Sequence, residues 1–143
     1  MSAGEAAPYP AWWIEIAEGD LATAEAILRN PALPPRGAAG LAQQAAEKAL
    51  KAAIALGGHE PPRTHSLLAL AHQVPERLAI GELSADLAAL TDAVGAARYP
   101  DPTELIYEPE EALRLIADAR VLVTAVVAFF ASEGIDVSRL TPR

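Results

Sequence analysis

The sequence predicts an all-α protein, an up-and-down bundle of about five helices. Two observations favour this fold: apolar residues recur at steps of three and four in several segments, and no segment shows the alternation of a strand. Proline pairs and glycines separate these segments, as expected of helix breaks. With 143 residues, the chain has the length of one domain. We expect the bundle to span residues 11–133, between tails at residues 1–10 and 134–143.

The first helix is expected from about Ala11 to Arg29. Its predicted core stripe includes Trp13, Ile16 and Leu21, which recur at helical spacing. Trp12 falls outside that stripe, so we expect it at the edge of the core or at an interface.

The second helix, from Leu41 to Leu56, shows the longest uninterrupted helical pattern and is expected to pack at the centre of the bundle. Most of its apolar residues are alanine, the best helix former, whose small side chain lets neighbouring helices approach closely. Its polar residues share one face, and we expect that face to be solvated, with Glu47 and Lys48 as ordinary surface charges. These polar residues are Gln43, Gln44, Glu47, Lys48 and Lys51.

Three further helices complete the expected bundle. The third runs from about Thr64 to Gln73, and its predicted apolar face includes Leu68; the fourth runs from Glu82 to Ala93. The fifth starts at Pro109, runs to about Ser132 and is closed by Gly134. Its segment 121–131 is apolar nearly all the way round, so it requires cover from other helices or from a second copy of the chain. We therefore expect a homodimer.

Bulk properties exclude several classes of protein. The formal charge of −8 argues against non-specific nucleic-acid binding, which depends on lysine and arginine. The absence of cysteine excludes disulfides, thiolate metal sites and a cysteine nucleophile. Segment 121–131 is too short to cross a bilayer, which takes about 20 residues, and the first residues, MSAGEAAPYP, lack the pattern of a signal peptide. We expect a cytoplasmic protein with no membrane association.

Three motifs occur in order along the chain: QQAAEKALKAAIALGG at residues 43–58, PRTHSL at 62–67 and ARYP at 97–100. Together they resemble the HEPN family, small helical domains associated with nucleotides and RNA, over about Trp12 to Phe130. The resemblance implies a helical bundle that binds a nucleotide or RNA. It also implies, as a frequent partner, a minimal nucleotidyltransferase in a toxin/antitoxin-like pair.

HEPN ribonucleases carry an arginine followed four to six residues later by a histidine, and two copies of this motif meet across a homodimer. Arg98 matches the arginine of that motif, but no histidine follows it. The resemblance therefore implies a non-catalytic or degenerate member of the family.

The candidate nucleotide-binding residues are Arg98, Tyr99, His65 and Tyr107. Arg98 and Tyr99 stand where the fourth helix is expected to end, and a guanidinium presents a fork of donors that matches phosphate; the alternative role of Arg98 is a helix C-cap. His65 stands at the start of the third helix, where it serves as an acid/base group, a phosphate donor or simply a hydrogen-bonded structural residue. Tyr107 lies at the far end of the long loop.

The sequence contains no zinc-ligand spacing and no glycine-rich phosphate loop, so we expect neither a metal nor a cofactor. Three functions remain. The leading one is a non-catalytic, nucleotide-associated HEPN module that partners a minimal nucleotidyltransferase. The alternatives are a HEPN ribonuclease with a non-standard site around Arg98, and a helical dimerisation adaptor without a ligand.

Overall fold

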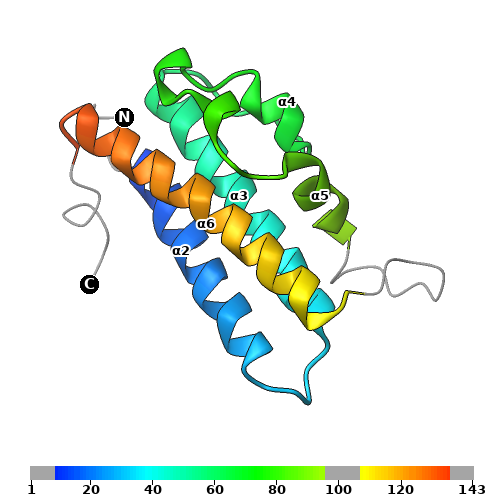
Figure 1. Ribbon diagram of the computed structural model, residues 1–143. Coiled ribbons are helices and arrows are strands. Elements are labelled where there is room, and N and C mark those ends of the chain that lie inside the picture. Colours follow the sequence, from blue (N-terminus) through cyan, green and yellow to red (C-terminus); the bar gives the residue numbers. More distant parts are fainter. Residues whose placement is uncertain (1–8, 96–106, 136–143) are drawn as a thin grey trace.

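Three long helices form the body of the protein. A computed structural model describes residues 9–95 and 107–135, which fold as an all-α bundle and confirm the predicted fold class. The long helices lie side by side, with α2 running opposite to both α3 and α6 (Figure 1). They are α2 (Tyr9–Leu28), α3 (Pro35–Leu56) and α6 (Pro109–Ser132).

Two short helices, α4 (Leu67–Ala71) and α5 (Leu87–Asp92), pack against α3 and against each other (Figure 1). Between them lie the 3-10 turns η1 (Glu76–Leu78) and η2 (Ile80–Glu82), joined by Ala79 in the left-handed conformation at φ 52°. A third 3-10 turn, η3 (Ala93–Gly95), continues α5. The tails expected at residues 1–8 and 136–143 lie outside the described residues.

The central helix starts earlier than predicted. The sequence suggested Leu41, but α3 begins at Pro35. Proline is well suited to the first helical position because its missing amide hydrogen would have had no partner there. The same residue that we interpreted as a helix break is therefore a helix start.

The two short helices are shorter than predicted. Ser66 caps α4, since its hydroxyl accepts from the amide of Ala69, and the helix begins at Leu67 rather than near Thr64. Asp86 caps α5 in the same way, with Oδ1 accepting from the amide of Ala89 at 2.9 Å. The prediction that Leu68 belongs to the apolar face was wrong.

Leu68 is 50% exposed, because a five-residue helix docks through only one pair of side chains, Leu67 and Leu70. A similar correction applies to α2, where Ile16 is 43% exposed and Ile14 is fully buried in its place. Trp12, expected at the edge of the core or at an interface, is 57% exposed.

The last helix has the predicted bounds, Pro109–Ser132, and Gly134 follows it with φ +83°. It packs against α2 and α3, so the other helices bury part of its apolar circumference. Over its most apolar 18 residues the mean hydropathy is 1.9, and by length and composition α6 is able to cross a membrane. From the sequence, only residues 121–131 were judged against the length of a membrane span, and not the whole helix. A helix in the core of a bundle can have the same length and apolar composition as a membrane-spanning helix.

The polar stripe of α3 is not a solvent face, contrary to prediction. Gln43 is fully buried and Glu47 is 5% exposed, while Lys48 and Lys51 are half-buried. The reason is the central position of α3, which contacts α2, α4, α5 and α6. Of all its residues, Arg36 alone is exposed.

Candidate functional site

A buried carboxylate organises the polar stripe of α3. Glu47 Oε1 lies 2.8 Å from His65 Nδ1 and accepts from Gln43 Nε2 at 3.0 Å, while Oε2 lies 2.9 Å from Lys51 Nζ. Gln43, Glu47 and Lys51 occupy successive turns of α3, and His65 reaches them from the segment between α3 and α4. We refer to Gln43, Glu47, Lys51 and His65 as the Glu47 cluster.

The cluster keeps Glu47 ionised. Burial raises the pKa of Glu47, but the hydrogen bonds from His65, Gln43 and Lys51 lower it by more than burial raises it. The pKa of Glu47 therefore lies below the ordinary value of 4.5. A carboxylate that accepts from three neighbours has most of its hydrogen-bonding capacity filled. Glu47 is thus an anion at neutral pH, and the side chains around it are arranged to hold it in that state.

His65 connects this interior to the surface. Its side chain is 54% exposed, whereas the Glu47 side chain that it contacts is only 7% exposed. An ionised carboxylate is only an acceptor, so the ring nitrogen facing it, Nδ1, carries the hydrogen. The other ring nitrogen, Nε2, has no hydrogen-bond partner among the described residues and remains able to meet a ligand from solvent.

Gln43 holds the backbone of the same segment. Its Nε2 donates both to Glu47 and to the carbonyl of His65, the latter at 3.3 Å, which fixes the orientation of the amide. Its Oε1 is left buried without a partner among the described residues.

The neighbouring lysines are paired and do not form a free basic patch. Lys51 Nζ lies 5.9 Å from the centroid of the Trp13 ring in addition to its contact with Glu47. Lys48 Nζ lies 3.3 Å from Asp20 on α2 and 2.8 Å from Gln44. Each cation of the stripe therefore has an acidic neighbour.

The start of α4 offers few donors for an anion. Its first amide, that of Leu67, donates to Thr91 Oγ1 on α5 at 3.1 Å, and that of Ala69 donates to its own cap, Ser66. The helix is also only five residues long. An anion near His65 must therefore be bound by side chains rather than by this helix terminus.

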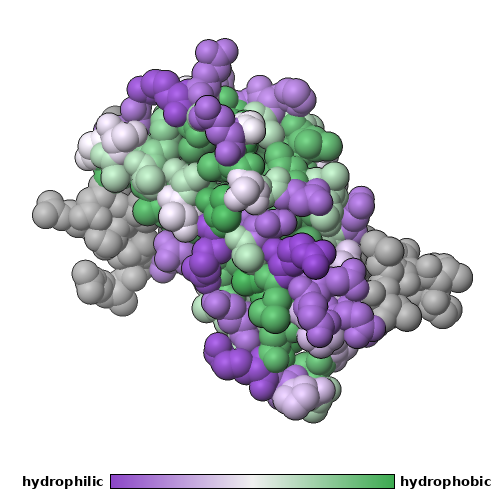
Figure 2. All heavy atoms as spheres, viewed as in Figure 1, coloured by the Kyte–Doolittle hydropathy of each residue, from purple (hydrophilic) through white to green (hydrophobic). Residues whose placement is uncertain are grey.

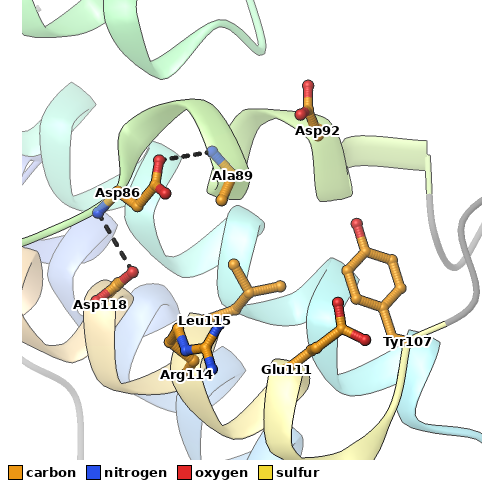
Figure 3. A pocket seen from close by; sticks show the side chains of 8 residues that line it. All are labelled: Asp86, Ala89, Asp92, Tyr107, Glu111, Arg114, Leu115 and Asp118. Atoms are coloured by element: carbon orange, nitrogen blue, oxygen red, sulfur yellow. Dashed lines mark hydrogen bonds between the residues drawn. The ribbon is translucent and has the colours of Figure 1, made fainter.

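A pocket of about 190 Å³ lies between α5 and α6 (Figure 3). Ala89 of α5 projects toward Leu115 of α6, and the backbone amide of Asp86, which caps α5, donates to Asp118 Oδ2 on α6 at 3.2 Å (Figure 3). The carboxylate of Asp92, at the end of α5, points away from the α6 side chains (Figure 3). The lining contains four carboxylates and one guanidinium, so it carries a formal charge of −3. The full lining is Asp86, Ala89, Asp92, Tyr107, Glu111, Arg114, Leu115 and Asp118.

Two of the four sequence-predicted site residues, His65 and Tyr107, are among the described residues, and they lie at different places. His65 belongs to the Glu47 cluster, whereas Tyr107 lines the acidic pocket, whose charge disfavours phosphate. Arg98 and Tyr99 lie outside the described residues. In residues 9–95 and 107–135, no group of three or more His, Asp or Glu side chains is placed to hold a metal ion.

Sequence reasoning missed Glu47, Gln43 and Lys51 as site residues because it assigned them to solvent. The signal that was available is the motif at residues 43–58 itself: its five polar residues fall on one face of a helix that is otherwise nearly all alanine and leucine. A helix at the centre of a bundle is covered by other helices on most sides, so a polar face on it is expected to be at least partly buried.

The comparisons with known proteins point to one family. A family model described as HEPN domain matches residues 10–131, most of the chain, and confirms the resemblance inferred from the three motifs. Neither the curated proteins nor the solved structures contain a match to the chain.

Proposed function

The chain belongs to the HEPN domain family, and we propose that it is a non-catalytic member that binds the phosphate group of a nucleotide at His65. The observation that supports this most is the half-exposed imidazole of His65, fixed from below by the buried carboxylate of Glu47. A fixed imidazole with one nitrogen open to solvent is an orienting device for a ligand. About half of the imidazole surface is exposed, so the ring is accessible to a ligand from solvent.

Arginine side chains supply the remaining positive charge in this proposal. Arg63 is exposed two residues before His65. Arg98, with Tyr99 as a stacking surface for the base, belongs to the proposed site through its motif, ARYP. Tyr107 contributes less, since it lines a pocket with a formal charge of −3.

The family suggests two partners. One is a second copy of the chain, and the other is a minimal nucleotidyltransferase, with which this chain would form a toxin/antitoxin-like pair. Exposed apolar side chains on α2, Trp12 and Ile16, support self-association. Co-expression with a minimal nucleotidyltransferase encoded beside this chain, followed by affinity purification, tests the second partner.

A titration with AMP and ATP, followed by NMR, tests the ligand. Bound nucleotide should shift the resonances of His65, Arg63 and Arg98, and the matched histidines His59 and His72 should move little. His65→Ala should weaken binding about tenfold or more, the loss expected for one charge-assisted hydrogen bond. No shifts at millimolar nucleotide would favour the dimerisation adaptor.

A ribonuclease with a non-standard site is the second candidate, because a carboxylate-oriented imidazole is also the arrangement of a general base. We expect no appreciable cleavage of structured or single-stranded RNA, since no histidine follows Arg98 at the family's spacing. RNA cleavage that is lost in both Arg98→Ala and His65→Ala would establish this candidate instead.

A further inference from the structure

The hydrogen bond between His65 and Glu47 fixes which nitrogen of the imidazole carries the hydrogen. The Nδ1 to Oε1 distance is 2.8 Å, and the carboxylate has no hydrogen to give. A neutral His65 is therefore the Nδ1–H form, and its Nε2 presents a bare lone pair to solvent. Only the doubly protonated imidazolium presents an Nε2–H donor.

The ring cannot easily exchange these roles by turning over. Lys51 and Gln43 hold the carboxylate, and Gln43 also holds the carbonyl of His65 itself. Turning the ring would break the contact at Nδ1 while the backbone stayed in place. The surroundings thus fix the ring and not only its proton.

A phosphate oxygen is an acceptor, so it repels the bare lone pair of the neutral ring and attracts the imidazolium. We propose that the site around His65 binds the phosphate group of a nucleotide only when the imidazole is protonated, so that each bound nucleotide brings one proton with it. This rests on the proposed function, and it adds that binding is controlled by pH. The proton resides on Nε2, between the ring and the phosphate oxygen.

The charged groups around the ring agree with this proposal. On α3, Glu47 faces the ring with its negative charge, and Lys51 lies on the far oxygen of that carboxylate. Arg63 precedes His65 by two residues on the same segment, and the Lys48–Asp20 pair joins α3 to α2 on the same stripe. From α5 the neighbour is a hydroxyl, that of Thr91, bound to the amide of Leu67. The carboxylate in contact with the ring keeps Nδ1 turned inward and Nε2 outward, and the exposed guanidinium of Arg63 is the cation available to attract the phosphate.

The first test needs no ligand. Long-range proton–nitrogen NMR spectra of the free protein report which nitrogen of a neutral histidine is protonated, with His59 and His72 as references in the same spectrum. We expect the Nδ1–H form for His65 above neutral pH. The Nε2–H form would overturn the proposal whether or not a nucleotide binds.

The second test measures the proton directly. Between about pH 7.5 and 9, AMP keeps a constant charge because the second phosphate pKa is about 6. Calorimetry in buffers of different ionisation enthalpy should show uptake of one proton per AMP, and affinity should fall about tenfold per pH unit, the limit for one linked proton. Binding without proton uptake overturns the inference, whereas no binding at any pH overturns the proposed function.

Variants separate His65 from other sources of pH dependence. In Glu47→Gln the carboxamide can either accept from Nδ1 or donate to it, so a neutral ring gains access to the Nε2–H form and proton uptake should fall well below one. His59→Gln and His72→Gln should leave it at one. An unchanged uptake in Glu47→Gln, with the fold intact by circular dichroism, would contradict the role assigned to the carboxylate.

Discussion

The carboxylate of Glu47 bonds to groups on α3 and on the segment that leads to α4, so its loss should affect both. We expect Glu47→Ala to lower the free energy of unfolding by about 3 kcal/mol, since removing one partner leaves the ammonium of Lys51 in a site only 12% exposed. Urea denaturation of the two proteins measures this difference.

An exposed ion pair provides the matched control. Arg120 and Glu25 join α6 to α2 at 2.8 Å with both side chains more than 40% exposed, at 49% and 43%. Glu25→Ala should therefore cost less than about 1 kcal/mol. Equal losses in Glu25→Ala and Glu47→Ala would show that burial of Glu47 has no energetic significance.

The stabilisation from Glu47 should depend on pH in a definite direction. Its pKa in the folded protein is lower than the 4.5 of an ordinary glutamate, because burial raises it less than the bonds from His65, Gln43 and Lys51 lower it. As pH falls, the Glu47 side chain of the unfolded chain therefore takes up its proton before that of the folded protein. The stabilisation from the ionised Glu47 is complete above about pH 4.5 and is lost as the pH falls below that value. Unfolding of the parent and of Glu47→Gln, compared from pH 7 down to pH 3, should show a difference that shrinks only below about 4.5.

At the scale of helices, the predictable features are those with local causes. Pro109 and Gly134 flank α6 and gave its bounds correctly, whereas Pro35 was interpreted as a break because proline serves equally well at the first position of a helix. The polar face of α3 was also identified correctly as a face. The burial of this face was not predicted, because part of its cover is the segment that contains His65, which contacts Glu47 although it lies 18 residues farther along the chain.

The alanines of α3 set how closely its neighbours approach, and this gives a prediction for the element. Ala49 is fully buried, whereas Ala22 on α2 is exposed. Ala49→Leu should lower the free energy of unfolding by about 1–3 kcal/mol, because added methylene groups in a packed interface displace the adjoining helices. Ala22→Leu, with the same change of side chain, should stay within about 0.5 kcal/mol. Similar values for the two variants would contradict a close-packed α3.

At the scale of the whole molecule, charged and apolar side chains are interspersed on the face shown in Figure 2. Several large apolar side chains are exposed on different helices, among them Leu113 at 55% on α6. Trp12 and Ile16 differ from the others because they stand four residues apart on one face of α2 and so form a joined surface. Tryptophan is among the residues that most often dominate the binding energy of an interface.

We therefore expect the protein to be a homodimer whose interface includes Trp12 and Ile16. Light scattering at tens of micromolar protein should give a mass of twice 14.9 kDa. Trp12→Glu should give a monomer, because it places a charge at the centre of the apolar contact, whereas Leu113→Glu, at a side chain of nearly equal exposure on α6, should leave the dimer intact. A monomeric parent protein would exclude the dimer, and dissociation by Leu113→Glu alone would place the interface on α6 instead of α2.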